Sequence, residues 1–231
     1  ALGIGIEQDR PGVGRNLQDH LQLRPVYKVS YVRTLNIDNR SLFKKAGMAL
    51  QYGLFRRGPL TMAPSQLGAF ACSSPDYDTP NLQFHVQPLS LDKFGDDLHP
   101  FAAFTASVCN LRPTSRGNIR LKSADMHDAP LIQPDYLSTE EDRHVAVDAI
   151  RLTRKIIAQP ALQRFRPDEF KPGAHLTSDE ELAQAASEIG TTIFHPVGTA
   201  RMGRPDDSNA VVDERLRVIG IERLRVIDAS V

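Results

Sequence analysis

The sequence predicts an α+β fold in which a mostly antiparallel β-sheet is flanked by helices on one side. Three apolar runs rich in β-forming residues follow one another at residues 67–72, 82–89 and 101–111. Clusters of Pro, Asp, Gly and Asn separate these runs, and short links favour antiparallel neighbours because parallel strands need a long crossover. Apolar residues at helical spacing before and after the runs predict the covering helices.

Further strands are expected on either side of these three runs. Alternation over residues 21–32 predicts one strand, and the turn residues at 116–118 lead into a short strand at 119–122. Near the end, Glu-Arg-Leu-Arg-Val-Ile occurs at 214–219 and again at 222–227. The alternation there predicts two strands joined by a tight turn, with the arginines on a solvated side.

Three helices are predicted from periodicity and capping signals. Apolar residues recur at helical spacing from about Asn39 to Gly58, which predicts an amphipathic helix that packs one face onto the domain. Ser138-Thr-Glu-Glu141 and Thr177-Ser-Asp-Glu180 both have the spacing of a capping box. In such a box the first hydroxyl accepts from the backbone three residues on, and the glutamate reaches back to the cap.

Composition excludes several classes of protein. Hydrophobic residues make up 41% and charged residues 24%, which is typical of a globular chain, and Lys plus Arg equals Asp plus Glu at 28 each. No net field therefore draws the chain toward a nucleic acid. No apolar run reaches the roughly 18 residues of a membrane span, and the start lacks a signal-peptide pattern, so we expect a cytoplasmic protein.

The cysteines and histidines give no sign of a metal. Cys72 and Cys109 lie in separate apolar runs, and two lone thiols predict reduced core residues rather than a disulfide framework or a zinc site. The histidines outside the segment described next show no ligand spacing. We predict no metal.

The chemistry is concentrated in Thr191-Thr-Ile-Phe-His-Pro-Val-Gly-Thr-Ala-Arg-Met-Gly203. Pro196 biases His195 toward an extended conformation, and Gly198 and Gly203 allow sharp turns or close approach of another group. This predicts a stiff loop that presents one imidazole, a group that titrates near neutral pH. Spacing alone also permits a core histidine that is hydrogen-bonded in a tight turn.

Several motifs, in one order, resemble the glucose-methanol-choline family of flavoprotein oxidoreductases. Residues 195–203 resemble the family signature His-Pro-x-Gly-Thr-x-x-Met-Gly. Residues 11–20 resemble the segment that enters the family's substrate domain, and 211–213 with 224–230 resemble its return to the flavin domain. Residues 111–117 and 130–137 are also similar, so the resemblance covers nearly the whole chain.

The resemblance implies a domain division. Residues 22–189 are expected to form the substrate-binding domain, 1–21 a connector from the FAD domain, and 190–231 the histidine loop and the return to that domain. No Gly-x-Gly-x-x-Gly unit follows a strand here, so the first half of the FAD-binding fold is missing. We therefore expect a piece of a larger enzyme that uses FAD but does not bind it alone, with the missing FAD domain as partner.

The resemblance also implies roles for individual residues. His195 is expected to take the proton of an alcohol hydroxyl while a hydride passes to the flavin. Asp228 and Ala229 are expected to lie against the ribityl and phosphate portion, with Asn16 also near the flavin. Without the family, Asp228 is equally well explained as a helix N-cap or a turn residue.

The substrate is expected to be a neutral primary or aryl alcohol, bound in part by Gln66 and Phe194. Choline-specific relatives place an acidic residue shortly before a Gly-x-Phe motif, whereas the matching segment here holds Gln66, and the chain has no tryptophan for a cation cage. Two alternatives are a lyase of the same family and a stand-alone, non-catalytic substrate-binding module.

Overall fold

The computed structural model describes residues 2–63, 65–93 and 95–231, and the chain divides into two compact units. We call Gln22–Leu111 with His144–Thr191 the sheet unit, and Ala1–Leu21 with Arg112–Arg143 and Thr192–Val231 the loop unit. Residues from the middle of the chain thus join its two ends in the loop unit. The division into domains at 21/22 and 189/190 stays a prediction.

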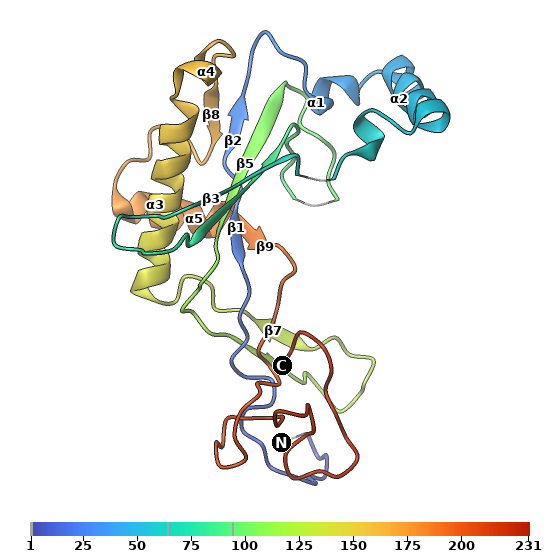
Figure 1. The fold of residues 1–231 in the computed structure, drawn as a ribbon, viewed down its shortest axis with the longest axis vertical. Helices are drawn as coiled ribbons and strands as arrows, with labels where there is room; N and C mark the ends of the chain where they lie inside the picture. The colour runs from blue at the N-terminus through green and yellow to red at the C-terminus, as the bar shows by residue number, and fades with distance from the viewer. Residues whose placement is uncertain (1, 64, 94) are drawn as a thin grey trace. The chain divides into compact units, whose positions relative to one another are not determined.

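The predicted α+β class, with a mostly antiparallel sheet and flanking helices, is confirmed (Figure 1). The main sheet has seven strands, and every pair whose register is defined is antiparallel. Its principal order is β3 (Leu67–Ala71), β4 (Leu82–Gln87), β5 (Ala103–Asn110), β1 (Leu21–Leu23) and β9 (Gly190–Thr192), while β2 (Val26–Lys28) pairs with β5 and with β8 (Asp168–Lys171).

Short strands account for most differences from the predicted sheet. The expected strand at 21–32 is interrupted at Pro25, which has no N–H to donate to a ladder; its carbonyl instead accepts from the Ala106 amide at 2.9 Å. Strands β8 and β9 were not predicted, because three or four residues show too little alternation. The expected strand at 119–122 is β6 (Asn118–Arg120), which pairs with β7 (Leu131–Gln133) in the loop unit.

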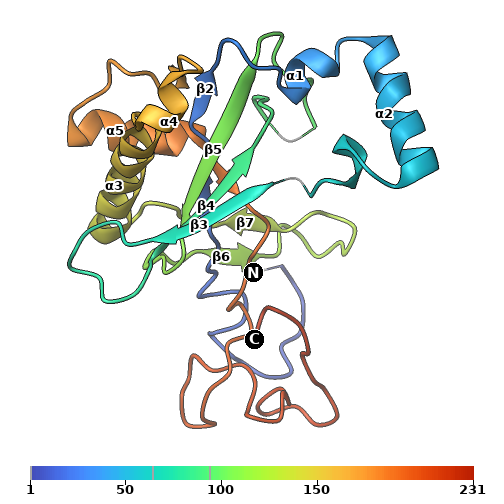
Figure 2. The same cartoon turned by 45° about the horizontal axis from the view of Figure 1, so that its top comes forward.

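Helices α3 (Glu140–Ile157), α4 (Pro160–Gln163) and α5 (Asp179–Ile189) gather on one side of the strands in both views (Figures 1 and 2). Buried residues of α3 include Val145, Ala149 and Ile150, and α5 buries Leu182. The helical spacing predicted Val145, Ala149 and Leu182 on these buried faces, whereas Ile156, expected on the same face of α3, is 41% exposed.

Both helix caps lie one residue later than predicted, and only the cap of α5 is a complete capping box, because the Asp142 carboxylate of α3 accepts from the Thr114 and Ser115 amides instead. Ser178, not Thr177, accepts from the Glu181 amide at 3.2 Å, and the Glu181 carboxylate accepts from the Ser178 amide at 3.0 Å. In α3 the hydroxyl of Thr139, not Ser138, accepts from the Asp142 amide at 3.2 Å. Two adjacent hydroxyl residues stand at each site, and the sequence pattern does not distinguish them.

The prediction that the first long helix packs its apolar face onto the domain is wrong. Helix α2 (Leu42–Phe55) has no buried residue, and it follows the short α1 (Leu35–Asp38) and precedes a 3₁₀ turn at Pro59–Thr61. Its apolar side chains are exposed: Leu42 is 80% and Phe43 93% accessible. Figures 1 and 2 both show α2 standing apart from the strands.

The two strands predicted at 214–219 and 222–227 are also absent from this described part of the chain. Only isolated bridges form there, Val212 with Val218 and Arg217 with Arg225. Leu216 and Arg223 adopt positive φ angles of 63° and 61°, which break an extended run. The segment instead packs Val218 into a small buried cluster, so the arginine alternation does not mark a sheet edge.

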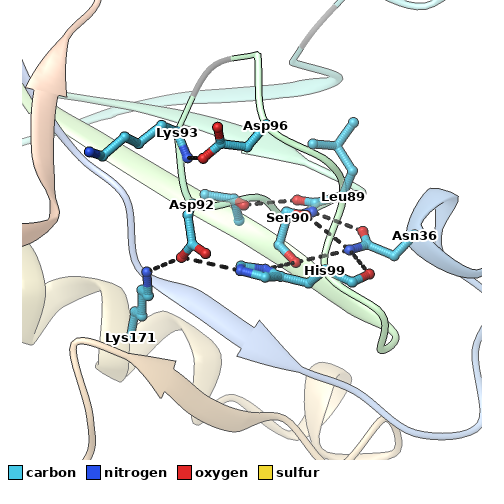
Figure 3. Close-up of polar contacts among 9 residues, drawn as sticks. Asn36, Leu89, Ser90, Asp92, Lys93, Asp96, His99 and Lys171 are labelled. Carbon is cyan, nitrogen blue, oxygen red and sulfur yellow. Dashed lines mark hydrogen bonds and ion pairs between the residues drawn. The ribbon is translucent and has the colours of Figure 1, made fainter.

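A buried polar network holds the connection between β4 and β5 (Figure 3). The Asn36 amide donates to the carbonyls of Ser90 and His99, each at 2.9 Å, and accepts from the Ser90 amide at 2.8 Å. The His99 ring lies 2.9 Å from the Ser90 hydroxyl and 3.3 Å from Asp92, which Lys171 also contacts. Ser90 is fully buried, so this serine, histidine and aspartate join loops and offer no nucleophile to solvent.

Candidate active site

His195 lies on an exposed loop directly after β9, as the proline-flanked pattern predicts. Its neighbours are also accessible: Phe194 is 70% exposed and has a φ of 64°. A positive φ is rare for a bulky residue and persists only when its surroundings hold it. The imidazole is therefore not a buried core side chain, and the backbone that carries it is held in an unusual conformation.

Asp19 holds this conformation. Its carboxylate accepts from the His195 amide at 3.0 Å, from the Thr192 hydroxyl at 2.5 Å and from the Tyr136 hydroxyl. The Thr192 oxygen in turn accepts from the Phe194 amide at 2.8 Å. Asp19 is only 8% exposed, so these donors replace water around a nearly buried charge.

Tyr136 is affected by the same contact. Its partial burial and its hydrogen bond to the Asp19 carboxylate raise the pKa of the phenol above its usual value of 10.0. The hydroxyl therefore keeps its proton at neutral pH and acts as a donor to Asp19. Residues from three distant parts of the chain thus meet behind the histidine loop.

A second set of contacts fixes the other end of the loop. The amides of Gln18 and Val197 exchange hydrogen bonds with each other's carbonyls at 3.0 and 2.8 Å. Asn16 donates to the Gly198 carbonyl at 3.1 Å and accepts from Arg116 at 3.2 Å. Gly198 has a φ of 88°, and a Cβ there would lie 2.7 Å from the Asn16 carbonyl oxygen. Only glycine fits this close approach.

The structure thus brings Asn16, Phe194 and His195 into one loop cluster. His20 joins them: its ring contacts that of His195 edge to face, with 5.6 Å between the ring centroids. Asp19 and Tyr136 were missed as candidates. Both lie within motifs that resemble the family, but nothing in the sequence showed that a carboxylate at 19 and a phenol at 136 would meet.

Asp228 and Ala229 lie in an exposed turn of the same unit. The Asp228 carboxylate accepts from the Ser230 amide at 2.8 Å and from its hydroxyl at 2.5 Å. These bonds lower the pKa of Asp228, so it is charged at neutral pH. Asp228 is thus a turn residue, not the end of a strand. The Ser230 carbonyl accepts from the Ala200 amide at 2.6 Å, which ties this turn to the histidine loop.

Gln66 belongs to the sheet unit, where it is exposed just before β3 and donates through its backbone amide to the Val86 carbonyl at 2.9 Å. One face of that sheet is polar, which the sequence analysis did not single out. The register places Gln22 opposite Cys109, His85 opposite Ser107, and Gln87 opposite Thr105. The alternation of polar residues along 82–87 was the available signal.

Hydrogen bonds connect this polar face. The Gln22 amide lies 3.0 Å from the His85 ring, and the Arg24 guanidinium reaches Gln22 and Gln87 at 3.5 Å each. Arg24 is 5% exposed, and this burial lowers its pKa. Arg24 is thus a nearly buried cation on the polar face of this sheet.

The residues of the loop unit fit the ring and ribityl portion of a flavin better than its pyrophosphate. An exposed imidazole, a glycine without space for a side chain and a charged aspartate suit the ring and ribityl portion. The chain offers no Gly-x-Gly-x-x-Gly turn for the pyrophosphate. Within the described ranges there is neither a group of three metal-binding side chains nor a helix long and apolar enough to cross a membrane.

Comparison with protein families matches residues 113–231 to the GMC oxidoreductase family, and the chain belongs to this family. GMC oxidoreductases are FAD flavoproteins that act on CH–OH groups. Among curated relatives, the alcohol dehydrogenase [acceptor] of Pseudomonas putida is 38% identical over 99% of this chain and 41% of its own. Human mitochondrial choline dehydrogenase is 38% identical over 100% of this chain and 39% of its own.

Solved structures agree with the fold. Pyridoxine 4-oxidase from Mesorbium loti aligns with 100% of this chain and 41% of its own at a TM-score of 0.78 and 27% identity. A variant of the formate oxidase of Aspergillus oryzae RIB40 aligns with 99% of this chain and 44% of its own at a TM-score of 0.85 and 24% identity, which supports the fold alone. The chain spans about two fifths of the length of the curated relatives it matches.

Proposed function

We propose that this chain supplies the substrate-binding part and the catalytic base of an FAD-dependent alcohol oxidoreductase. The observation that carries the proposal is the exposed imidazole of His195, on a loop whose backbone is fixed at both ends by Asp19 and by Asn16. In the proposal the flavin is held largely by an FAD domain outside this chain.

Bound FAD supplies the acceptor for the hydride that leaves the alcohol carbon. His195 takes the hydroxyl proton on a ring nitrogen as the carbon–oxygen double bond forms. The Asp19 bond to the His195 amide fixes the backbone, so only the side-chain torsions of His195 remain to be ordered when substrate binds. Such positioning lowers the entropy cost of reaching the transition state. A positioned base contributes about 10²- to 10⁴-fold.

Asp228, Ala229 and Asn16 are proposed to hold the ribityl and phosphate portion of the cofactor. The Asp228 carboxylate, charged at neutral pH, is an acceptor for sugar hydroxyls, and Ala229 presents backbone in the same exposed turn. Asn16 orients the Gly198 carbonyl at the end of the histidine loop.

The proposed substrate is a neutral primary or aryl alcohol, with Gln66 and Phe194 among the contacting residues. Relatives named for alcohol and for choline are equally similar, each at 38% identity, so overall similarity does not decide between these substrates. Gln66 supports the neutral alcohol, because it is exposed and uncharged and so provides no counter-charge for a quaternary ammonium. The 70% exposed ring of Phe194 offers an apolar contact to an alkyl or aryl group.

The test is anaerobic reduction of the flavin in the complete protein with choline, a primary aliphatic alcohol and benzyl alcohol. We expect the neutral alcohols to reduce the flavin with higher kcat/KM than choline. His195→Gln should slow reduction by about 10²- to 10⁴-fold with the flavin still bound. His127→Gln, at an exposed histidine of the same unit, is the matched control and should not change the rate. Equal rates in the protein and its His195→Gln variant would show that His195 is not the base.

A further inference from the structure

We propose that helix α2 is a docking surface for an anionic lipid membrane, on which it lies without crossing. The proposal concerns the sheet unit and does not depend on the role of His195. It rests on three properties of residues 39–75: which side of the helix faces solvent, the sign of its charges, and its intrinsic stability.

The apolar arc of α2 is exposed, as are the other sides of the helix, on which only Met48 is partly covered. At 3.6 residues per turn, Leu42, Phe43, Ala46, Leu50 and Leu54 fall within an arc of about 120°. Leu42 is 80%, Phe43 93%, Leu50 62% and Leu54 65% exposed. An ordinary surface helix has the reverse arrangement, with its apolar arc buried. Figure 2 shows the helix standing apart from the strands, and none of its residues is buried against the described part of the sheet unit.

The charges of this segment are all positive. Residues 39–75 contain no Asp or Glu, whereas they contain Arg40, Lys44, Lys45, Arg56 and Arg57. Lys44 and Lys45 lie on the side of the helix opposite the apolar arc, and Arg56 and Arg57 follow its last turn. Tyr52 and Phe55, which are 37% and 67% exposed, lie on the lysine side as well. A helix with an exposed apolar arc and only cationic charges is complementary to a surface that is apolar inside and negatively charged outside, which is an anionic bilayer.

Apart from the Ser41 hydroxyl, which caps it by accepting from the Lys44 amide at 3.4 Å, the helix is poorly stabilised by its own sequence. Lys44 and Lys45 lie in the first turn, where the helix dipole disfavours positive charge, and that turn has no acidic residue. Gly47 and Gly53 lower the helix propensity further, and a helix of 14 residues is marginal in water without packing. Burial of the apolar arc in a lipid interface supplies the packing that the protein does not.

The experiment is flotation of the complete polypeptide with vesicles of phosphatidylcholine alone or of equal parts phosphatidylcholine and phosphatidylglycerol. We expect binding only to the phosphatidylglycerol vesicles, with a marked loss at high salt. Phe43→Gln, Leu50→Gln and Leu54→Gln should each lower the partition coefficient by about tenfold. Lys44→Gln with Lys45→Gln should lower it by about 25-fold, at about fivefold for each charge.

The matched control is Leu121→Gln with Met126→Gln, since these apolar residues are 65% and 89% exposed but lie in the loop unit. This variant should bind vesicles as the unchanged protein does. Hydrogen exchange of the unchanged polypeptide gives a second measurement that needs no substitution: peptides covering 42–55 should gain protection only when phosphatidylglycerol vesicles are present.

Three results would overturn the proposal. The first is no binding, or equal binding to both kinds of vesicle. The second is binding that survives the three apolar substitutions. The third is strong protection of 42–55 without vesicles, which would mean that another part of the complete polypeptide or a second copy covers the arc.

Discussion

Asp19 is the residue on which the conformation of the histidine loop depends. One nearly buried carboxylate accepts from a backbone amide, a threonine hydroxyl and a tyrosine hydroxyl. An amide side chain has the same shape, but one of its two ends is a donor. It leaves at least one of these three donors unsatisfied, or brings two donors together.

We therefore expect Asp19→Asn to destabilise the protein by about 2–4 kcal/mol, because a buried donor without an acceptor costs about 1–3 kcal/mol and a charged acceptor is also lost. Urea unfolding followed by circular dichroism measures this change. Asp9→Asn, at an exposed position in the same unit, should change stability by less than about 0.5 kcal/mol. Equal effects of the two substitutions would contradict the role of Asp19.

For single residues, the sequence predicted the exposed histidine and its stiff loop, because proline and glycine restrict or free the backbone at their own positions. It did not predict the groups that hold the loop. Asp19 lies 176 residues before His195 and 117 before Tyr136, and such contacts depend on the tertiary fold. Phe194 illustrates the same limit: its positive φ follows from the Thr192 hydroxyl and Asp19, not from any preference of phenylalanine.

Among the elements, α3 is fixed to β8 by a partly buried ion pair. Arg154 donates to both carboxylate oxygens of Glu169 at 2.8 and 2.9 Å, and to the carbonyls of Gly173 and Leu176 at 3.0 and 2.8 Å. The side chain of Glu169 is only 7% exposed, and the bond to it raises the pKa of Arg154.

Arg154→Ala should destabilise the protein by on the order of 3–5 kcal/mol, because it leaves a buried carboxylate without its partner. One turn earlier, Arg151 pairs with Asp179, but these side chains are 45% and 56% exposed. Arg151→Ala is thus a matched control on the same helix and should cost at most about 1 kcal/mol. Comparable losses in urea unfolding would show that burial does not distinguish the two pairs.

Elements were predicted best where one signal dominated. The helices at 140–157 and 179–189 and the strands at 67–71, 82–87 and 103–110 follow apolar periodicity. The caps differed by one residue because adjacent hydroxyls compete. The prediction of strands at 214–227 was wrong because alternation does not reveal positive φ angles. The predicted packing of α2 was wrong because periodicity shows that a helix is amphipathic without showing what covers its apolar face.

For the whole molecule, we expect a fall in pH to destabilise the loop unit before the sheet unit. Hydrogen bonds from Arg217 hold the pKa of Asp213 at about 2. The pKa values of Asp207 and Asp228 are also lowered, mainly by hydrogen bonds from the residues that follow them. Burial raises the pKa of Asp142, but bonds from Ser115 and Thr114 more than offset it, so the net shift is downward.

The sign of the pH dependence follows from these shifts. Each folded pKa lies below the unfolded value of about 3.9, so the stabilisation is fully present above about pH 4 and is lost as the pH falls toward about 2. In the sheet unit the shifts partly cancel: Lys171 chiefly lowers the pKa of Asp92 and the Thr177 amide that of Glu181, while burial raises the pKa of Asp148.

We expect the urea midpoint to be nearly constant from pH 6 to about 4 and to fall between about 4 and 2. Asp213→Asn removes one of the titrating groups, so it should make that fall shallower, whereas Asp9→Asn should leave its slope unchanged. A midpoint that rises on acidification would contradict the direction of the shifts.

The histidine signature is contiguous in the chain, but the residues that fix its backbone come from distant parts of the sequence. Residues 16–20, Tyr136 and Thr192 must all be in place before the backbone that carries the ring is fixed. A short synthetic peptide with the complete signature would therefore have the right sequence without the loop conformation seen in the protein. A transfer of this site to another scaffold has to include an aspartate, a tyrosine and an asparagine together with the loop whose backbone they fix.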